Sequence, residues 1–388
     1  MKTRIIGMSH SPFGKLEASL ETLISEAASA ALADAGVEAR DIDAIYVGQF
    51  NSGMCAQEFP ASLALQADPD LRFKPATRCE NACASGSAAL YQGINLIEGG
   101  LARRVLVIGA EKMTEASPAA IAEGLLGASY RPESQGVEAG FAGIFAEVAR
   151  AYFERFGDHT EALARIAAKN HANGVHNPLA QLRKDLGVEF CRKVSDKNPV
   201  VAPPLKRTDC SPVSDGAAAL VLAHPEAAPA GPRQVRFRAR AQVTDFMPLA
   251  RRDLTRLEGA ERAWQQLLAE GNVGLEALSL AEVHDCFTIA ELMIYEAMGL
   301  APHGQGARAI EEGWVMPDGR LPINPSGGLK SKGHPVGATG VSMHVLAARQ
   351  LLGEATGVQI PDARLAAVFN MGGMGVANYA SLLERVTD

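Results

Sequence analysis

Hydrophobic and polar positions follow one loosely repeated succession in two halves of the chain. In each half an opening strand precedes a helix with apolar residues at the 3.6-residue spacing, a short strand, a helix of small residues and two further strands. The predicted pairs are strands at 3–9 and 234–243, helices at 19–35 and 255–271, strands at 42–48 and 279–285, helices at 82–98 and 338–352, strands at 104–109 and 365–369, and strands at 217–223 and 376–380. Strands that alternate with helices favour an α/β fold in layers over a helical bundle or a β-sandwich.

Residues 115–205 have no counterpart in the second half. They include two predicted helices, at 145–155 and 160–171, and a polar run at 192–198. Long excursions from a compact fold are more often functional than purely structural, so we expect this insertion to cover or shape a site. The alternative is a structural elaboration. The Pro/Ala-rich stretch 224–232 is a candidate junction between the halves.

Composition narrows the class of protein. Of the 388 residues 47% are hydrophobic, which suits two or three buried domains, and the net charge of −7 comes from interspersed acids and bases, so we expect no nucleic-acid partner. No apolar run approaches the ~20 residues of a membrane span, and the apolar core of residues 1–8 is too short for a signal peptide. The chain is therefore expected to lie off the membrane.

The six cysteines are scattered along the chain, which favours a reducing cytoplasm over a disulfide framework. Cys79 and Cys83 are four residues apart, but no second close pair or nearby histidine completes a zinc site. We therefore expect no metal.

Four short segments carry the candidate chemistry. Three contain cysteine or histidine among glycine and polar residues, and the fourth is a glycine-rich turn expected to supply backbone only. The segments are Glu80–Gly86, Val283–Phe287, Gly333–Gly340 and Asn370–Gly375. They occupy equivalent positions of the two halves, after strands and before helices, so the carboxyl ends of the strands should bring them together.

Cysteine is the natural nucleophile for acyl transfer between thiols. Cys83 is predicted at the start of a helix, where unpaired amides should lower the pKa of its thiol, and His334 is placed to take its proton. Considered singly, Cys83 is better explained as a small core cysteine, and His334 is equally compatible with a turn histidine. The four segments together favour catalysis.

His284, Asp285 and Cys286 end a predicted apolar strand, and three ionisable residues in a row there are unusual for packing alone. Asp285 is expected either to orient a histidine or to solvate a turn. Cys286 is the better candidate for a proton carrier opposite Cys83.

Together these residues resemble the thiolase family, in particular its sterol-carrier-protein branch. The resemblance covers nearly the whole chain and includes three further motifs: Lys169–Pro178, Ile323–Gly328 and Ser214–Ala218. It implies a thiolase fold of two pseudo-symmetric βαβαβαββ halves, each five-stranded, in α/β/α/β/α layers with an inserted loop domain. The implied divisions are 1–118 plus 206–230, 119–205 and 231–388.

The resemblance also implies roles for individual residues. Cys83 matches the acylated nucleophile, and His334 matches the histidine that activates it and contributes to an oxyanion hole. The amides of Cys83 and of the turn at Met371 and Gly372 match a second oxyanion hole.

The sequence departs from ordinary thiolases at two places. It has His284-Asp285-Cys286-Phe287 in place of Asn-Glu-Ala-Phe, and Phe369-Asn370-Met371 in place of a Cys-x-Gly. By resemblance to the sterol-carrier-protein branch, Cys286 replaces the missing second cysteine as the α-carbon acid/base. His284 takes the place of the water-holding asparagine.

The expected function is acyl-CoA:acetyl-CoA C-acyltransferase activity, with acyl-CoA and acetyl-CoA as substrates and no cofactor. A homodimer or homotetramer is implied. The alternatives are a ketoacyl-synthase-type condensing enzyme, and a subunit that depends on a small zinc-ribbon acyl-CoA-binding partner. A nicotinamide-dependent oxidoreductase is disfavoured because Gly373-Met374-Gly375 lacks the third glycine of a dinucleotide-binding turn.

Overall fold

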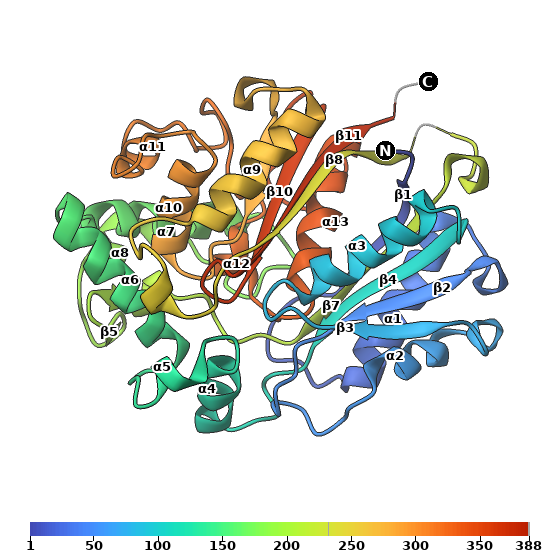
Figure 1. Ribbon diagram of the computed structural model, residues 1–388, viewed down its shortest axis with the longest axis horizontal. Helices are drawn as coiled ribbons and strands as arrows, with labels where there is room; N and C mark the ends of the chain where they lie inside the picture. The colour runs from blue at the N-terminus through green and yellow to red at the C-terminus, as the bar shows by residue number, and fades with distance from the viewer. Residues whose placement is uncertain (232, 387–388) are drawn as a thin grey trace.

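Two sets of strands join edge to edge in one nine-stranded sheet (Figure 1). The computed structural model describes residues 1–231 and 233–386. The strands lie in the order β3 (Ala76–Cys79), β2 (Ala44–Gly48), β4 (Arg104–Glu111), β7 (Gly216–Ala223), β1 (Arg4–His10), β8 (Val235–Thr244), β11 (Ala377–Arg385), β10 (Leu365–Gly372) and β9 (Leu280–Val283). The short antiparallel pairing of β1 with β8 joins the two halves.

The order of strands repeats between the halves as predicted, with one difference. The N-terminal half has five strands, whereas the C-terminal half has four among the described residues. At the position of the fifth, Ile323 makes only an isolated parallel bridge to Ala281 of β9. The expectation of two five-stranded halves is therefore wrong in the second half. There the chain leaves the sheet after the single bridged pair of residues and continues towards the predicted site.

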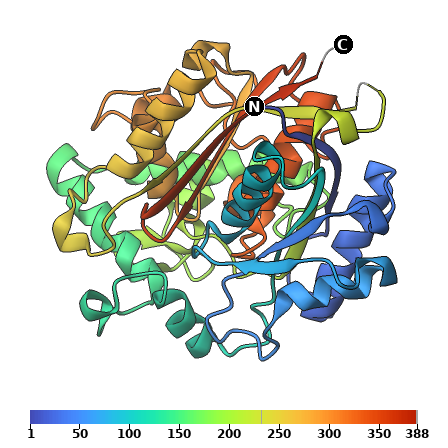
Figure 2. The same cartoon turned by 45° about the vertical axis from the view of Figure 1, so that its right-hand side comes forward.

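Helices form three layers around the two halves of the sheet (Figures 1 and 2). Helix α1 (Leu20–Ala35) covers the outer face of the first half, and α9 (Glu258–Gly271) covers that of the second. Helices α3 (Ser85–Glu98) and α13 (Thr339–Leu352) pack against each other between the halves. Because α13 contacts strands on both sides, it is buried on almost every face. The expected α/β fold in five layers is confirmed.

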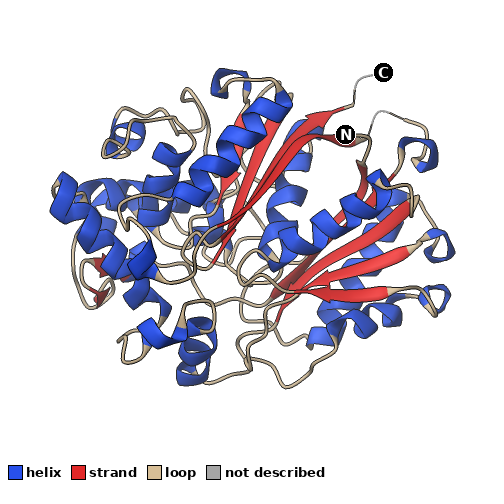
Figure 3. Ribbon diagram, viewed as in Figure 1, coloured by secondary structure: helices blue, strands red, loops and turns tan. Residues whose placement is uncertain are grey.

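The long segment between β4 and β7 is mostly helical (Figure 3). It contains α4 (Pro118–Leu126), α5 (Arg131–Ser134), α6 (Phe141–Phe156), α7 (Thr160–Val175), α8 (Gly187–Arg192) and the small pair β5 (Val200–Ala202) and β6 (Leu205–Lys206). The two helices predicted here are confirmed as α6 and α7. Helix α7 packs against α10 (Thr288–Ala297) and α12 (Gly328–Lys332) of the second half, so the insertion lies next to the predicted site.

The remaining helices are α2 (Pro60–Leu63) and α11 (Ala307–Glu311). The predicted junction 224–232 contains one short 3₁₀ turn, and its last residue, Pro232, lies outside the described residues. Within the described part of the chain, no helix combines the length and apolar character needed to cross a bilayer.

Glycines let α3 and α13 approach at their N-termini. A Cβ atom added to Gly86 would lie 2.7 Å from the carbonyl oxygen of Gly337 and 2.9 Å from the amide nitrogen of Val341. A Cβ on Gly337 would lie 2.6 Å from the carbonyl oxygen of Ala110 at the end of β4. These neighbours are backbone atoms, which cannot swing aside, so a larger residue at either position would push the halves apart.

We predict that Gly86→Ala lowers the free energy of unfolding by about 1–3 kcal/mol, the range found for overpacked cores. Alanine is favoured over glycine in a helix by only about 1 kcal/mol, so the clash should dominate. Urea denaturation followed by circular dichroism measures the change. The matched control is Gly14→Ala, whose Cβ would make an ordinary contact 3.9 Å from Gln181 and should change stability little. An unchanged Gly86→Ala midpoint would contradict the tight-contact interpretation.

Candidate active site

Cys83 lies in a tight turn between β3 and α3. Ala82 before it has a φ of 50°, the left-handed conformation that alanine rarely adopts. The turn is held by hydrogen bonds from the Ala84 amide to the carbonyl oxygen of Asn81 and from the Ser85 amide to that of Ala82, each 3.0 Å long. Helix α3 begins only at Ser85, so Cys83 precedes the helix by two residues instead of beginning it.

Cys83 is buried, with 5% of the residue exposed. Burial raises its pKa to about 12, although the Gly373 amide, which donates to the sulfur, acts in the opposite direction. The predicted lowering of the pKa by the helix start is therefore wrong for the resting protein, because desolvation outweighs the amides. The thiol is protonated at neutral pH, and its reaction needs a base.

His334 lies in the loop between α12 and α13, where glycine and proline set the backbone. Its amide donates to Ser214 Oγ at 2.9 Å, and its Nδ1 lies 2.7 Å from Thr339 Oγ1. Burial lowers the pKa of His334 to about 3, with Lys332 acting in the same direction. The imidazole is neutral at pH 7, with Nε2 left to face the site.

His284 follows the end of β9, and its side chain is fully buried. Asn370 Nδ2, at the end of β10, lies 2.9 Å from His284 Nδ1, while His284 Nε2 has no hydrogen-bond partner within the described protein. Burial lowers the pKa of His284 well below its usual value. Asn370 also donates to the Cys83 carbonyl at 3.2 Å and accepts from Ser87 Oγ at 2.8 Å.

The expectation that Asn370–Gly375 contributes no side-chain chemistry is therefore wrong, because Asn370 contacts both the nucleophile turn and an imidazole. Asn370, Met371 and Gly372 belong to β10, and the turn itself begins one residue later. The amide that donates to the Cys83 sulfur is that of Gly373. Met371 and Gly372 stay predicted oxyanion donors.

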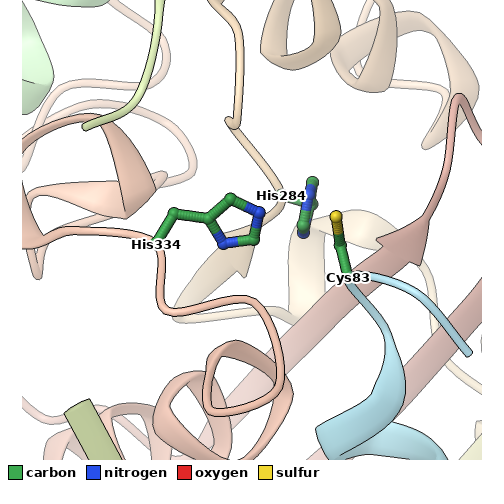
Figure 4. A group of neighbouring side chains, drawn as sticks. All are labelled: Cys83, His284 and His334. Atoms are coloured by element: carbon green, nitrogen blue, oxygen red, sulfur yellow. The ribbon is translucent and has the colours of Figure 1, made fainter. Parts of the chain in front are cut away.

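Cys83, His284 and His334 form one cluster of side chains that point towards one another (Figure 4). The Cys83 sulfur and one ring nitrogen from each histidine all lie within 4.8 Å of one another. The two imidazoles pack edge to face, with ring centroids 5.1 Å apart and planes 85° apart. We call these three residues the trio.

Cys286 comes from the segment between β9 and α10 and lines the same cavity as Cys83 and His334. Burial raises the pKa of Cys286 well above its usual value, and Cys83 and Asp285 raise it further. The cavity measures about 410 Å³ and is mostly apolar. Its other walls come largely from the insertion, including Ile121, Leu125, Phe141, Ala142 and Val201. The insertion therefore shapes the site, as expected.

Asp285 neither orients a histidine nor solvates a turn, contrary to both expectations. Its carboxylate accepts from the amides of Leu329 and Lys330 at the start of α12, at 2.6 and 3.1 Å, and from Asn170 Nδ2 at 2.8 Å. Burial raises its pKa to about 7, and Glu291 contributes in the same direction. Asp285 is thus a buried helix cap that holds the segment leading to His334.

The motif at 169–178 anchors the same segment. Lys169 forms a buried ion pair with Glu291 at 2.6 Å and also donates to the carbonyl of Ile323. Asn173 and Asn177 donate to the carbonyls of Asn324 and Ser326, each at 3.0 Å. Helix α7 and the residues that follow it therefore fix the chain just before the His334 loop.

Glu111, at the end of β4, ties the His334 loop to the first half and was not predicted as a site residue. It accepts hydrogen bonds from the amides of Phe50, Asn51 and Gly337, at 2.9, 3.0 and 2.9 Å. Burial raises the pKa of Glu111 to about 7, against the effect of these donors. The feature of the sequence that could have identified Glu111 is a carboxylate at the end of an apolar strand.

The sequence of this chain is similar to those of known protein families and of individual proteins. Residues 3–226 match the family model described as the thiolase N-terminal domain, and residues 241–385 match the thiolase C-terminal domain-like model. An acetyl-CoA acetyltransferase of Methanothermobacter thermautotrophicus is 37% identical over 98% of this chain and 99% of its own. Sterol carrier protein 2 of Oryctolagus cuniculus is 32% identical over 92% of this chain and 66% of its own.

Among solved structures, that of the Ltp2-ChsH2(DUF35) aldolase is similar, with a TM-score of 0.83. The match covers 99% of this chain and 98% of that chain at 22% sequence identity. At this identity the similarity establishes the fold alone.

We predict that alkylation of Cys83 by iodoacetamide accelerates without a plateau as the pH rises from about 6 to about 10, because the pKa of the buried thiol is far above the ordinary value of about 8.5. His334→Ala should slow the reaction near neutral pH, since Nε2 of His334 is no longer there to take the proton. Rate constants from peptide mass spectrometry measure both effects.

The matched control for this experiment is His171→Ala, which removes another buried histidine outside the trio. It should leave the rate unchanged. A plateau below about pH 8 would indicate a stable thiolate–imidazolium pair instead. Unchanged kinetics in a folded His334→Ala variant would remove His334 from the role of base.

Proposed function

The chain belongs to the thiolase family, and on that premise we propose that it is an acetyl-CoA C-acyltransferase that makes or cleaves 3-oxoacyl-CoA through an acyl-Cys83 intermediate. The observation that carries the proposal is the meeting of Cys83, His334 and Cys286 at one apolar cavity, with His284 grouped beside Cys83 and His334. The acetyl-CoA acetyltransferase named above, matched along its whole length, supports the same activity.

In the first half-reaction the Cys83 sulfur attacks the carbonyl carbon of an acyl-CoA while His334 takes the thiol proton. The coenzyme A sulfur leaves as a thiolate and takes a proton from Cys286. One thioester is exchanged for another, so little free energy is needed. The raised pKa of Cys286 suits this step, because it keeps a proton on the sulfur until the leaving group needs it.

In the second half-reaction the Cys286 thiolate takes an α-proton from acetyl-CoA. The resulting enolate attacks the acyl-Cys83 carbonyl, a carbon–carbon bond forms, and Cys83 leaves and recovers its proton from His334. The reverse sequence is thiolytic cleavage. The amides of Cys83, Met371 and Gly372 are proposed to stabilise the tetrahedral oxyanion, at about 3 kcal/mol for each good donor.

A second candidate follows from the trio itself. One cysteine with two histidines is the set usual in condensing enzymes of the ketoacyl synthase type, which decarboxylate an extender thioester instead of deprotonating it. The test is whether the protein releases carbon dioxide from malonyl-CoA or exchanges the α-hydrogens of acetyl-CoA with deuterated solvent. Under the thiolase proposal only exchange occurs.

The proposal also includes a partner protein, an oligomeric state and a cellular compartment. The similar Ltp2-ChsH2(DUF35) aldolase combines Ltp2 with a DUF35 protein. Activity of this chain should therefore be assayed both with and without candidate partner proteins. Co-purification with candidate acyl-CoA-binding proteins, including small zinc-ribbon ones, tests for such a partner. We further propose a homodimer or homotetramer in the reducing cytoplasm, where the Cys83 thiol stays free, with coenzyme A thioesters as substrates and no cofactor.

We predict that incubation with an acyl-CoA places a single acyl group on Cys83, because among the described residues this is the cysteine grouped with both imidazoles. Peptide mass spectrometry after rapid acid quenching locates the adduct. The control is Cys83→Ala, which should carry no adduct. An acyl group found mainly on Cys286 or Cys79 would contradict the assignment of the nucleophile.

Cys286→Ala is expected to accept an acyl group on Cys83 but to lose deuterium exchange into acetyl-CoA, because no thiolate remains to take the α-proton. Condensation should fall by roughly 10²–10⁴, the range for a lost general base. Exchange is read by mass spectrometry and condensation by the 3-oxoacyl-CoA formed.

The matched control is Cys191→Ala, which shortens a buried cysteine outside the cavity and should keep both activities. Condensation by Cys286→Ala at a near wild-type rate would show that the proton carrier lies elsewhere.

A further inference from the structure

The two imidazoles of the trio are held by partners of opposite character. Thr339 Oγ1 donates to the carbonyl of Pro335 at 2.9 Å, so its oxygen is left to accept the hydrogen bond from His334 Nδ1. His334 therefore carries its proton on Nδ1 and presents a bare Nε2 to the site. A bare ring nitrogen is what a base for Cys83 requires.

The orientation of the Asn370 amide is fixed independently of His284. The Cys83 carbonyl can only accept a hydrogen bond, so the group 3.2 Å from it must be the NH₂ of Asn370. The Ser87 hydroxyl donates to the other end of the amide, Oδ1, at 2.8 Å. The same NH₂ group lies 2.9 Å from His284 Nδ1, which must therefore be the acceptor. A neutral imidazole with an accepting Nδ1 carries its proton on Nε2.

We infer that Asn370 is a positioning residue that holds His284 in the Nε2–H tautomer, so that the trio presents one base and one hydrogen-bond donor. The buried Nε2–H of His284, which has no hydrogen-bond partner among the described residues, then donates to the oxygen of a thioester bound beside Cys83. This catalytic consequence rests on the proposed function, whereas the tautomer itself does not.

The hydrogen bond from Asn370 also disfavours metal binding by the trio. One cysteine and two histidines within 4.8 Å of one another are a familiar ligand set for a divalent metal ion. A metal on His284 Nε2 would move the ring proton to Nδ1, where it would face an N–H group of Asn370. Metal-bound histidines instead donate from the second nitrogen to an oxygen acceptor. Asn370 therefore keeps the trio available for thioesters.

The wild-type protein tests the inference directly. Protein labelled with ¹⁵N at histidine should show His284 protonated at Nε2 and His334 protonated at Nδ1 in long-range proton–nitrogen spectra at neutral pH. The signals are assigned by their loss in His284→Asn and His334→Asn variants. Protonation of His284 at Nδ1, or at both nitrogens, would overturn the inference even if the protein is an active thiolase.

Asn370→Asp gives a second test. A carboxylate accepts where the amide donated, so the His284 proton should move to Nδ1 and leave Nε2 free for a metal. The variant should bind Co²⁺ at least about tenfold more tightly than wild type, seen in the thiolate-to-cobalt absorption band, as expected for a changed second-sphere partner.

The matched control is Asn198→Asp, which places the same carboxylate beside backbone carbonyls of the insertion, those of Cys191 and Lys193 among them, without touching an imidazole. It should bind Co²⁺ as wild type does. Equal Co²⁺ affinity of wild type and folded Asn370→Asp would overturn the inference.

Kinetics separate this inference from the proposed function. If both hold, Asn370→Asp should still accept iodoacetamide at Cys83, while condensation falls by roughly 10²–10³, the cost of one lost oxyanion donor. If wild type shows the predicted tautomers but never acylates Cys83, the proposed function fails and the positioning role stands. If wild type condenses acetyl-CoA with the opposite tautomer on His284, the proposed function stands and the inference fails.

Discussion

The approach of α3 to α13 without intervening side chains is the constraint on which the site depends. Cys83 precedes one of these helices and His334 precedes the other, so the distance between the reacting groups is set by how closely the two N-termini pack. Gly86 and Gly337 meet backbone to backbone, and Gly340 would place a Cβ 2.4 Å from the amide of Ser87. A methyl group at any of these points would push the two helix N-termini apart. A misplacement of reacting groups by about 1 Å is enough to slow a reaction. The glycines therefore belong to the chemistry as much as to the packing.

Buried polar groups then fix the parts that packing alone leaves loose. The His334 loop has few apolar side chains of its own. Its position is determined by Glu111 of the first half, by Asp285 of the second half and by α7 of the insertion. Burying such groups is unfavourable unless each has partners. Here each carboxylate accepts from several amides or side-chain N–H groups, so the interior carries a polar scaffold that is largely paired. This scaffold also explains why the inserted segment must be attached to the second half and not only to the first.

Much of this was accessible from the sequence, because it depends on periodicity and on chain order. The strand–helix alternation indicated the layers, and the equivalent placement of Cys83 and His334 before paired helices indicated their convergence. Three features were not accessible. The pKa of Cys83 depends on burial, which neighbours along the chain do not show. Asp285 caps a helix 44 residues away, and Asn370 reaches His284 across the parallel pairing of β9 and β10. The missing fifth strand of the second half reflects the same limit, since the chain at Ile323 is drawn into contacts with α7 instead of continuing a ladder.

The raised pKa of Cys83 has a consequence for the lifetime of the protein. Peroxides attack thiolates and react slowly with neutral thiols. A cysteine whose pKa is low enough to keep it a thiolate is always ready to react, but it is also open to oxidation between turnovers. In this chain the sulfur is buried, protonated and beside a neutral base, so it becomes reactive only while a proton acceptor and a substrate are in place. The same burial that makes each reaction step depend on His334 therefore protects the resting cysteine from conversion to sulfenic acid.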